Sequence, residues 1–168
     1  MDQAAALAAL DCLEDQAITT WIDGGWGIDA LLGEQTRPHD DLDLVVEQGS
    51  LVAAQSALRA LGYRHDSTIE PGLPARLVLR DSERRQIDFH PVVLDADGNG
   101  WQLLGDGTWC SYPSEGLTGR GLIGGRSVRC LTPELQLRHH LGYAPGDNDR
   151  HDLRLLAEKF GLRQPPGM

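Results

Sequence analysis

The chain has 168 residues, of which 40% are hydrophobic, and this is enough for one domain with a sizeable core. Its formal net charge of −10 argues against nucleic acid as a partner, because phosphate backbones are bound by clustered Lys and Arg. No stretch approaches the roughly 18 apolar residues that cross a membrane, and the N-terminus has no basic leader, so we expect a cytoplasmic protein without a membrane partner.

Hydrophobic periodicity predicts alternating helices and strands in the first part of the chain. These are a helix over 3–15, a strand over 18–22, a helix over 26–33, a strand over 42–46 and a helix over 50–62. Gly24 and Gly25 are expected to form a tight turn after the first strand. Gly33 and Gly62 should end the next two helices, the second of which has Ser50 as its expected N-cap.

Strand patterns dominate the following section, before the chain turns helical again. We expect a weak strand over 63–69, an antiparallel hairpin of strands over 75–81 and 85–94, and a hairpin over 122–131 around paired glycines. Thr132 and Pro133 should begin a helix that continues to 143, and a last helix should cover 150–162. The predicted organisation is an α/β core of residues 1–131 followed by a small helical pair in residues 132–168.

The segment HDDLDLVV places two carboxylates on one face of a strand. Side chains alternate along a strand, so Asp41 and Asp43 point the same way, while Leu42 and Leu44 point into the core. The two α-carbons are then roughly 7 Å apart, and carboxylates at this spacing repel each other. A divalent cation removes the conflict, and Mg²⁺ prefers one or two carboxylates together with phosphate oxygens and water.

A third acid and a glycine turn complete the predicted site. Asp88 lies between Ile87 and Phe89 in a later strand, so its side chain projects away from the core and can face the first two acids. Gly24 and Gly25 leave backbone N–H groups bare where a strand meets a helix, which forms an anion cradle. Phosphates bound there, metal at the acids and a base nearby make a nucleotidyl transfer site.

This pattern resembles the DNA polymerase β-like nucleotidyltransferase superfamily. The segments WIDGGWGIDALLGEQTRPHDDLDL, IDFHPVVLDADG and LRHHLGYAPGDNDRHDLRLL resemble the small lincosamide nucleotidyltransferases, and the related aminoglycoside 2″-nucleotidyltransferases share the first of them. The resemblance runs from about residue 21 to 156 and is weakest over 51–74. It implies an α+β fold, with a mixed sheet flanked by helices, in which residues 1–131 form the catalytic domain and residues 132–168 a helical substrate-binding extension.

The resemblance also implies a role for each matching residue. Asp41 and Asp43 would be ligands of Mg²⁺, and Asp88 would be either the general base or a third ligand. Gly24 and Gly25 would contact the triphosphate of ATP or another nucleotide. Two further residues before the acids, Arg37 and His39, would help to bind the same triphosphate.

Other residues have competing interpretations. His90 shares the face of Asp88 and could touch substrate or metal, or could be a structural histidine. Asp40 should point away from Asp41 and serve a structural role. A metal cluster of the later histidines is rejected, because adjacent helical residues diverge by about 100°. Three acids near the last helix are best explained by the helix dipole, with pocket lining as the alternative: Asp147, Asp149 and Asp152.

The expected function is a Mg²⁺-dependent transfer of a nucleoside monophosphate to a hydroxyl of a lincosamide antibiotic. An aminoglycoside is the alternative acceptor, since its positive charge would suit an acidic protein. A protein-modifying nucleotidyltransferase of a toxin–antitoxin pair, and a non-catalytic nucleotide sensor, are the hypotheses of another class. The resemblance also allows a homodimer, while nucleotide preference and the modified hydroxyl stay open.

Overall fold

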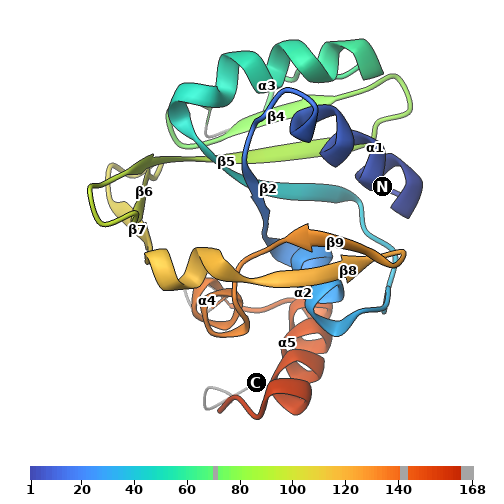
Figure 1. Cartoon of the computed structure of the whole chain (residues 1–168), viewed down its shortest axis with the longest axis vertical. Coiled ribbons are helices and arrows are strands. Elements are labelled where there is room, and N and C mark those ends of the chain that lie inside the picture. Colours follow the sequence, from blue (N-terminus) through green and yellow to red (C-terminus); the bar gives the residue numbers. More distant parts are fainter. Residues whose placement is uncertain (70–71, 141–143, 164–168) are drawn as a thin grey trace.

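The computed structural model describes residues 1–69, 72–140 and 144–163. Its centre is a mixed sheet of order β1-β2-β5-β4-β3, in which β2 and β5 run parallel and the other neighbours are antiparallel (Figure 1). These strands are β1 (Thr20–Ile22), β2 (Asp41–Glu47), β3 (Arg64–His65), β4 (Leu77–Arg80) and β5 (Gln86–Leu94).

Two β-hairpins extend this centre. The first, β6 (Gly100–Leu103) with β7 (Trp109–Tyr112), continues the sheet where β6 pairs with the last residues of β5. The second, β8 (Arg120–Ile123) with β9 (Arg126–Arg129), is a separate ribbon. Figure 1 shows the first hairpin at the left-hand edge of the molecule and the second below the sheet, beside the second helix of the chain.

Helices cover the sheet and extend the lower part of the molecule. The α-helices are α1 (Gln3–Glu14), α2 (Gly24–Leu32), α3 (Leu51–Leu58), α4 (Pro133–His139) and α5 (Asp147–Phe160). Short 3-10 turns are η1 (Gln48–Ser50), η2 (Arg59–Leu61) and η3 (Ser114–Thr118). No helix in the described residues is both long and apolar enough to cross a membrane.

The alternation along β2 separates the core from the cleft side. Leu42, Leu44 and Val46 are fully buried in the main core together with residues of α1 and α3. Asp41 and Asp43 lie on the opposite face and are only partly buried. The predicted orientation of this strand is therefore confirmed, and burial of the leucines determines its register.

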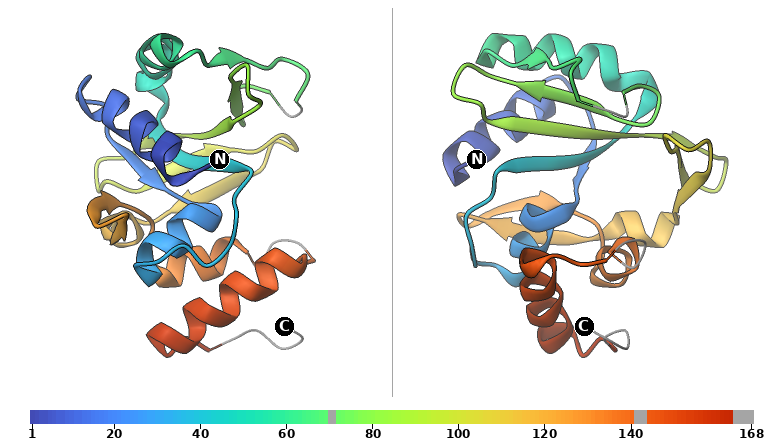
Figure 2. Two further views of the ribbon diagram at one scale, coloured as in Figure 1. Left: turned by 90° about the vertical axis from the view of Figure 1, so that its right-hand side faces the viewer. Right: turned by 180° about the vertical axis from the view of Figure 1, so that it is seen from behind.

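The two C-terminal helices pack on the lower side of α2. Figure 2 shows α5 on the far side of α2 from the sheet. Ile28 of α2 forms a small buried cluster with Leu153 and Leu156 of α5. This apolar contact fixes α5 relative to the start of α2, which adjoins the acids of β2. The division of the chain at residue 131 stays a prediction.

The α+β fold with a mixed sheet is confirmed, and so are most of the predicted elements. Both Gly33 (φ 81°) and Gly62 (φ 90°) end their helices in the left-handed conformation, as predicted. Ser50 is not a side-chain cap, since η1 precedes α3 and places Ser50 in helical conformation. Residues 141–143, the predicted end of the first C-terminal helix, and residues 164–168 lie outside the described residues.

Several element boundaries differ from the sequence prediction. The glycine pair begins α2 instead of preceding it, because the Asp23 side chain accepts from the Gly24 N–H and caps the helix. Helix α5 begins at Asp147, where the Asp149 carboxylate accepts from the Gly146 N–H. The weak strand over 63–69 shrinks to Arg64–His65, while the hairpin of β6 and β7 was not predicted as strands.

Candidate active site

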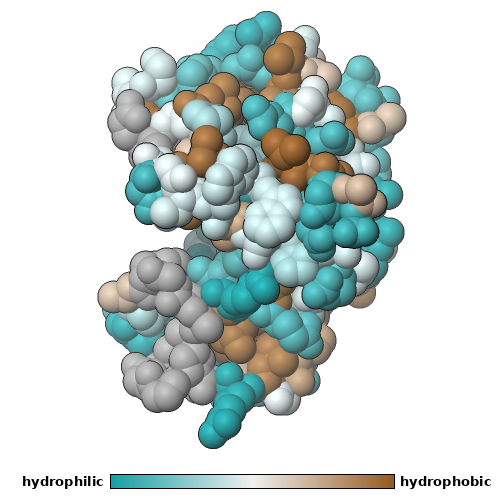
Figure 3. Space-filling model, turned by 90° about the vertical axis from the view of Figure 1, so that its left-hand side faces the viewer, coloured by the Kyte–Doolittle hydropathy of each residue, from teal (hydrophilic) through white to brown (hydrophobic). Residues whose placement is uncertain are grey.

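A cleft of about 1270 Å³ is the candidate active site. It is lined by the start of α2, by the acids of β2 and β5, by the β6–β7 hairpin, and by the end of α4 and the start of α5. Figure 3 shows the hollow between the upper part of the molecule and the lower one. Six of the seven predicted site residues line it: Gly24, Gly25, Arg37, Asp41, Asp43 and Asp88.

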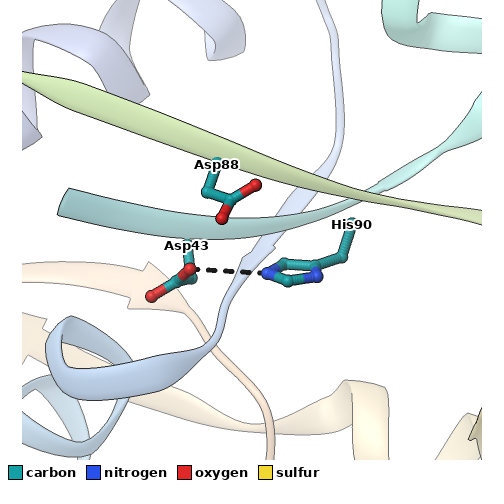
Figure 4. A group of neighbouring side chains, drawn as sticks. All are labelled: Asp43, Asp88 and His90. Atoms are coloured by element: carbon teal, nitrogen blue, oxygen red, sulfur yellow. Dashed lines mark hydrogen bonds and ion pairs between the residues drawn. The ribbon is translucent and has the colours of Figure 1, made fainter. Parts of the chain in front are cut away.

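The parallel pairing of β2 and β5 brings two of the predicted acids side by side on one face of the sheet. Asp43 and Asp88 are register partners across the two strands. Asp43, Asp88 and His90 each offer a ligand atom, and these atoms all lie within 4.8 Å of one another (Figure 4). Figure 4 also shows the His90 ring turned toward Asp43, and their closest atoms are Nε2 and Oδ1 at 3.4 Å. A cation could be held among these three side chains.

Asp41 lies at the edge of this group. Its register partner on β5 is Gln86, whose Nε2 donates to Asp41 Oδ2 at 3.5 Å. Burial raises the pKa of Asp41 to about 6, and the negative charges of Asp43, Asp88 and Asp40 add to the effect. The repulsion expected from the sequence is therefore present, and a cation in the cleft would relieve it.

The two carboxylate oxygens of Asp88 have different surroundings. Arg76 Nε donates to Asp88 Oδ2 at 2.5 Å, and the Arg76 Nη2 contacts the same oxygen. The second oxygen, Oδ1, is buried and has no hydrogen-bond partner in the described structure. Burial raises the pKa of Asp88, although Arg76 opposes the shift. A buried acceptor left without a partner indicates a place for a proton donor or a cation.

The glycine pair is needed for close approach as well as for its N–H groups. Gly24 has a φ of 59°, and a Cβ at this position would collide with the Asp43 carboxylate. A Cβ on Gly25 would lie 2.5 Å from Arg37 Nη2 and from His39 Nδ1. The start of α2 is thus packed directly against the acids and against the loop that precedes them. Its first-turn N–H groups have no acceptor within the helix.

The loop before β2 is anchored at both sides. Arg37 donates from Nε to Asp152 Oδ1 at 2.9 Å and from Nη2 to Oδ2 at 2.6 Å. His39 is buried and is not among the residues that line the cleft; its Nε2 lies 2.5 Å from Asp29 Oδ2, and Thr36 donates to Asp29 Oδ1. His39 therefore lies behind Gly25 and supports the loop, and it does not face the cleft as the predicted phosphate contact would require.

A hydrogen-bond chain supports His90 from the opposite wall. Tyr112 donates its hydroxyl to Gln102 Oε1 at 2.7 Å, and Gln102 Nε2 donates to the Ala75 carbonyl at 2.8 Å. The same Nε2 lies 3.3 Å from His90 Nδ1. Burial lowers the pKa of His90, but the Asp43 carboxylate, with Asp88 and Asp23, outweighs burial and raises it to about 9. His90 Nε2 therefore carries a proton and donates to Asp43.

His139 forms a second polar cluster in the cleft. Its Nδ1 lies 3.7 Å from Asp23 Oδ2, while its Nε2 lies 3.3 Å from the Ser111 carbonyl and 3.8 Å from Cys110 Sγ. Burial lowers the pKa of His139, but Asp23 and Cys110 outweigh burial and raise it to about 9. Both ring nitrogens face acceptors, which fits a protonated imidazole.

Several site residues could not be found from the sequence. Arg76 contacts Asp88 from just before β4, while Gln102 contacts His90 and Tyr112 contacts Gln102, and no local motif marks these residues. Asp152, for which the sequence favours a helix-dipole role with pocket lining as the alternative, is buried in the second turn of α5, lines the cleft and pairs with Arg37.

The assignment of Asp40 also changes with the structure. Asp40 lines the cleft because β2 begins only at Asp41, so strand alternation does not turn it away. Cys110 lines the cleft too, whereas Trp26 is buried against the His39 ring at 4.6 Å between centroids.

The fold is that of nucleotidyltransferases. Among solved structures, the lincosamide antibiotic adenylyltransferase LnuA in its lincomycin-bound form matches with a TM-score of 0.81 and 28% identity over 93% of this chain and 96% of that one. ANT(2″)-Ia in complex with adenylyl-2″-tobramycin matches with a TM-score of 0.75 and 23% identity over 95% and 89%, and it supports the fold alone.

Sequence comparison identifies the family. The family model of aminoglycoside-2″-adenylyltransferase matches residues 6–156, and the chain belongs to this family. A lincosamide resistance protein of Staphylococcus haemolyticus is 30% identical over 147 residues, covering 88% of this chain and 89% of that protein. A 2″-aminoglycoside nucleotidyltransferase of Klebsiella pneumoniae is 29% identical over 142 residues, covering 82% and 70%. The chain is therefore an enzyme of the nucleotidyltransferase class, and the predicted resemblance is confirmed.

Proposed function

We propose that the enzyme transfers AMP from ATP to a hydroxyl of a lincosamide antibiotic and requires Mg²⁺. The observation that carries this proposal is that Asp43 and Asp88 lie side by side on parallel strands, next to the two glycines that begin α2. The choice of acceptor rests on the similarity to the Staphylococcus haemolyticus resistance protein and to the lincomycin-bound structure.

The donor set fits a hard divalent cation. Asp41 and Asp43 would hold it, because burial and the mutual repulsion of the acids raise the pKa of Asp41 to about 6 and a cation offsets that repulsion. When bound, Mg²⁺ neutralises charge on the phosphates and on the pyrophosphate that leaves. His90, held by Gln102, keeps Asp43 oriented on the cleft side of the group.

The chain's own residues would carry the remaining steps. Asp88 Oδ1, which has no hydrogen-bond partner among residues 1–69, 72–140 and 144–163, takes the proton of the acceptor hydroxyl, while Arg76 holds the other oxygen. The hydroxyl oxygen then forms a bond to the α-phosphorus of ATP as the bond to pyrophosphate breaks. The Gly25 N–H, together with Arg37, binds the phosphates, while the Gly24 N–H stays donated to the Asp23 carboxylate.

An aminoglycoside is the second candidate acceptor, and one observation favours it. The start of α5 contributes Asp147 and Asp149 to the cleft. A polycationic acceptor would gain from these carboxylates, since electrostatic complementarity raises both affinity and association rate.

A mass-spectrometric transfer assay tests the proposal. Purified protein with Mg²⁺ and each nucleoside triphosphate is incubated with lincomycin, clindamycin or tobramycin, and each acceptor is examined for added nucleoside monophosphate. We expect adenylylated lincomycin, and we expect the Asp43→Asn variant to lose at least about 100-fold in kcat/KM. Asp97→Asn, an exposed aspartate in the turn between β5 and β6, is the matched control and should retain activity.

The other outcomes are equally informative. Adenylylation of tobramycin alone would keep the reaction and replace the acceptor. Full activity of Asp43→Asn would contradict the metal assignment. Magnesium-dependent nucleotide binding without any antibiotic product would redirect the search to a protein acceptor.

A further inference from the structure

The ion pair between Arg37 and Asp152 joins two segments that are far apart in the sequence. Arg37 lies in the loop before β2, and Asp152 lies in the second turn of α5. Arg37 Nε and Nη2 both donate to the carboxylate, at 2.9 and 2.6 Å, so the contact is bidentate. Asp152 is only 1% exposed, which is unusual for a carboxylate that has one cationic partner.

Asp152 is held in place by the packing of its own helix. The next residue, Leu153, and Leu156 one turn on are buried against Ile28 of α2. A buried carboxylate is destabilising unless it is paired, so the Arg37 guanidinium must stay in contact with it. The pair therefore restricts the guanidinium to one position, because both partners sit on rigid elements or are tied to them.

That position is beside the proposed phosphate site. Arg37 Nη2 lies so close to Gly25 that a Cβ there would be 2.5 Å from it. Nη1 donates to the Pro38 carbonyl at 3.0 Å. The described bonds use one N–H of each terminal nitrogen, so each keeps a second N–H for another acceptor, and Arg37 lines the cleft.

We propose that Asp152 is a positioning residue for the nucleotide: it holds Arg37 beside Gly25, where the guanidinium meets the polyphosphate of the co-substrate. This inference rests on the proposed function and deepens it. The family resemblance implies that α5 belongs to the acceptor-binding extension, and the positioning role would give the same helix a second task in nucleotide binding. One helix would thus serve both the nucleotide and the acceptor.

A purely charge-neutralising role for Asp152 predicts the opposite change in ATP affinity when the carboxylate is removed. If the carboxylate merely neutralised Arg37, it would compete with phosphate, and its removal would tighten ATP binding. A positioning role predicts weaker binding on removal, since a free arginine side chain must be ordered again by the ligand.

Isothermal titration of ATP in the presence of Mg²⁺, with no acceptor present, separates the two roles. We expect Asp152→Asn to raise the ATP Kd about tenfold, as for other residues that orient a ligand-binding side chain. The same change should leave the acceptor KM within about twofold, because a binding loss confined to one substrate appears in that substrate's constant alone. Glu158→Gln, which removes an exposed carboxylate bonded to Arg154 on the same helix, is the control and should leave the ATP Kd unchanged.

A double-mutant cycle shows whether the effect passes through Arg37. On an Arg37→Ala background, Asp152→Asn should cause no further loss of ATP binding. If Asp152→Asn does not fold, Arg37→Lys provides the same test, because lysine keeps the positive charge but cannot make the bidentate contact of the guanidinium. Unchanged or tighter ATP binding in Asp152→Asn, or additive losses in the double variant, would overturn the positioning role. No ATP binding by the unmodified protein would overturn the proposed function as well.

Discussion

Arg76 determines which oxygen of Asp88 is free to react. Its Nε and Nη2 contact Oδ2, while Oδ1 is buried and has no hydrogen-bond partner among the described residues. We expect Arg76→Gln to lower kcat at least about tenfold, since the candidate base loses its fixed orientation, with little change in the ATP KM. Arg76→Lys should be impaired as well, because an ammonium cannot reproduce the two-point contact. Steady-state kinetics with both substrates varied measures the effect.

A second arginine in the same hairpin controls for that variant. Arg85 donates from Nε to Asp81 Oδ2 at 2.6 Å, at the turn before β5 and outside the cleft lining. Arg85→Gln should therefore leave kcat unchanged. Equal losses in the Arg85 and Arg76 variants would show that the hairpin is only structurally weakened, and the orienting role would have to be abandoned.

The elements that carry the acids were predictable because local signals agree with the fold. In β2, alternating leucines and aspartates set both the strand and its orientation. The missed hairpin of β6 and β7 is short and mixes glycines with half-exposed residues, so its pairing depends on contact with β5 and not on its own pattern.

The same contrast applies to the site. The spacing of Asp41 and Asp43, two residues apart in a strand pattern, is visible in the sequence. The contacts of Arg76 and Asp152 join strand to loop and helix to loop, and neither spacing nor composition encodes them. The start of α5 was also displaced by three residues, because its acidic first turn reads equally well as a loop before the helix.

The start of α2 offers a prediction at this scale. Gly24→Ala places a Cβ against Asp43 and forces a left-handed backbone on alanine. We expect a loss of about 1–2 kcal/mol in the free energy of unfolding from the backbone, and a fall in kcat/KM as Asp43 is displaced. Gly33→Ala has a similar positive φ and no atom within 4 Å of the added Cβ, so it should lose stability but keep activity. Denaturant melts and kinetics on both variants test this, and equal activity in the two would refute the contact with Asp43.

At the scale of the whole molecule, the net charge of −10 includes several carboxylates gathered around one cleft. Their repulsion opposes folding, and a cation that binds only the folded state must stabilise it by mass action. At about 10 mM Mg²⁺ and a Kd of about 1 mM, the gain is about 1.4 kcal/mol. For a chain of this length that corresponds to a rise in Tm of about 3–6 °C.

General screening of the net charge would also raise Tm, so the measurement needs two controls. NaCl at the same ionic strength should give a smaller rise, because it screens all charges without binding at the acids. Asp43→Asn should lose the difference between the two salts, whereas Asp97→Asn, in an exposed turn, should retain it. Differential scanning calorimetry on the three proteins decides the matter. If NaCl matches Mg²⁺, or if Asp43→Asn keeps the full response, the stabilisation comes from the overall charge and the cation is not held at these acids.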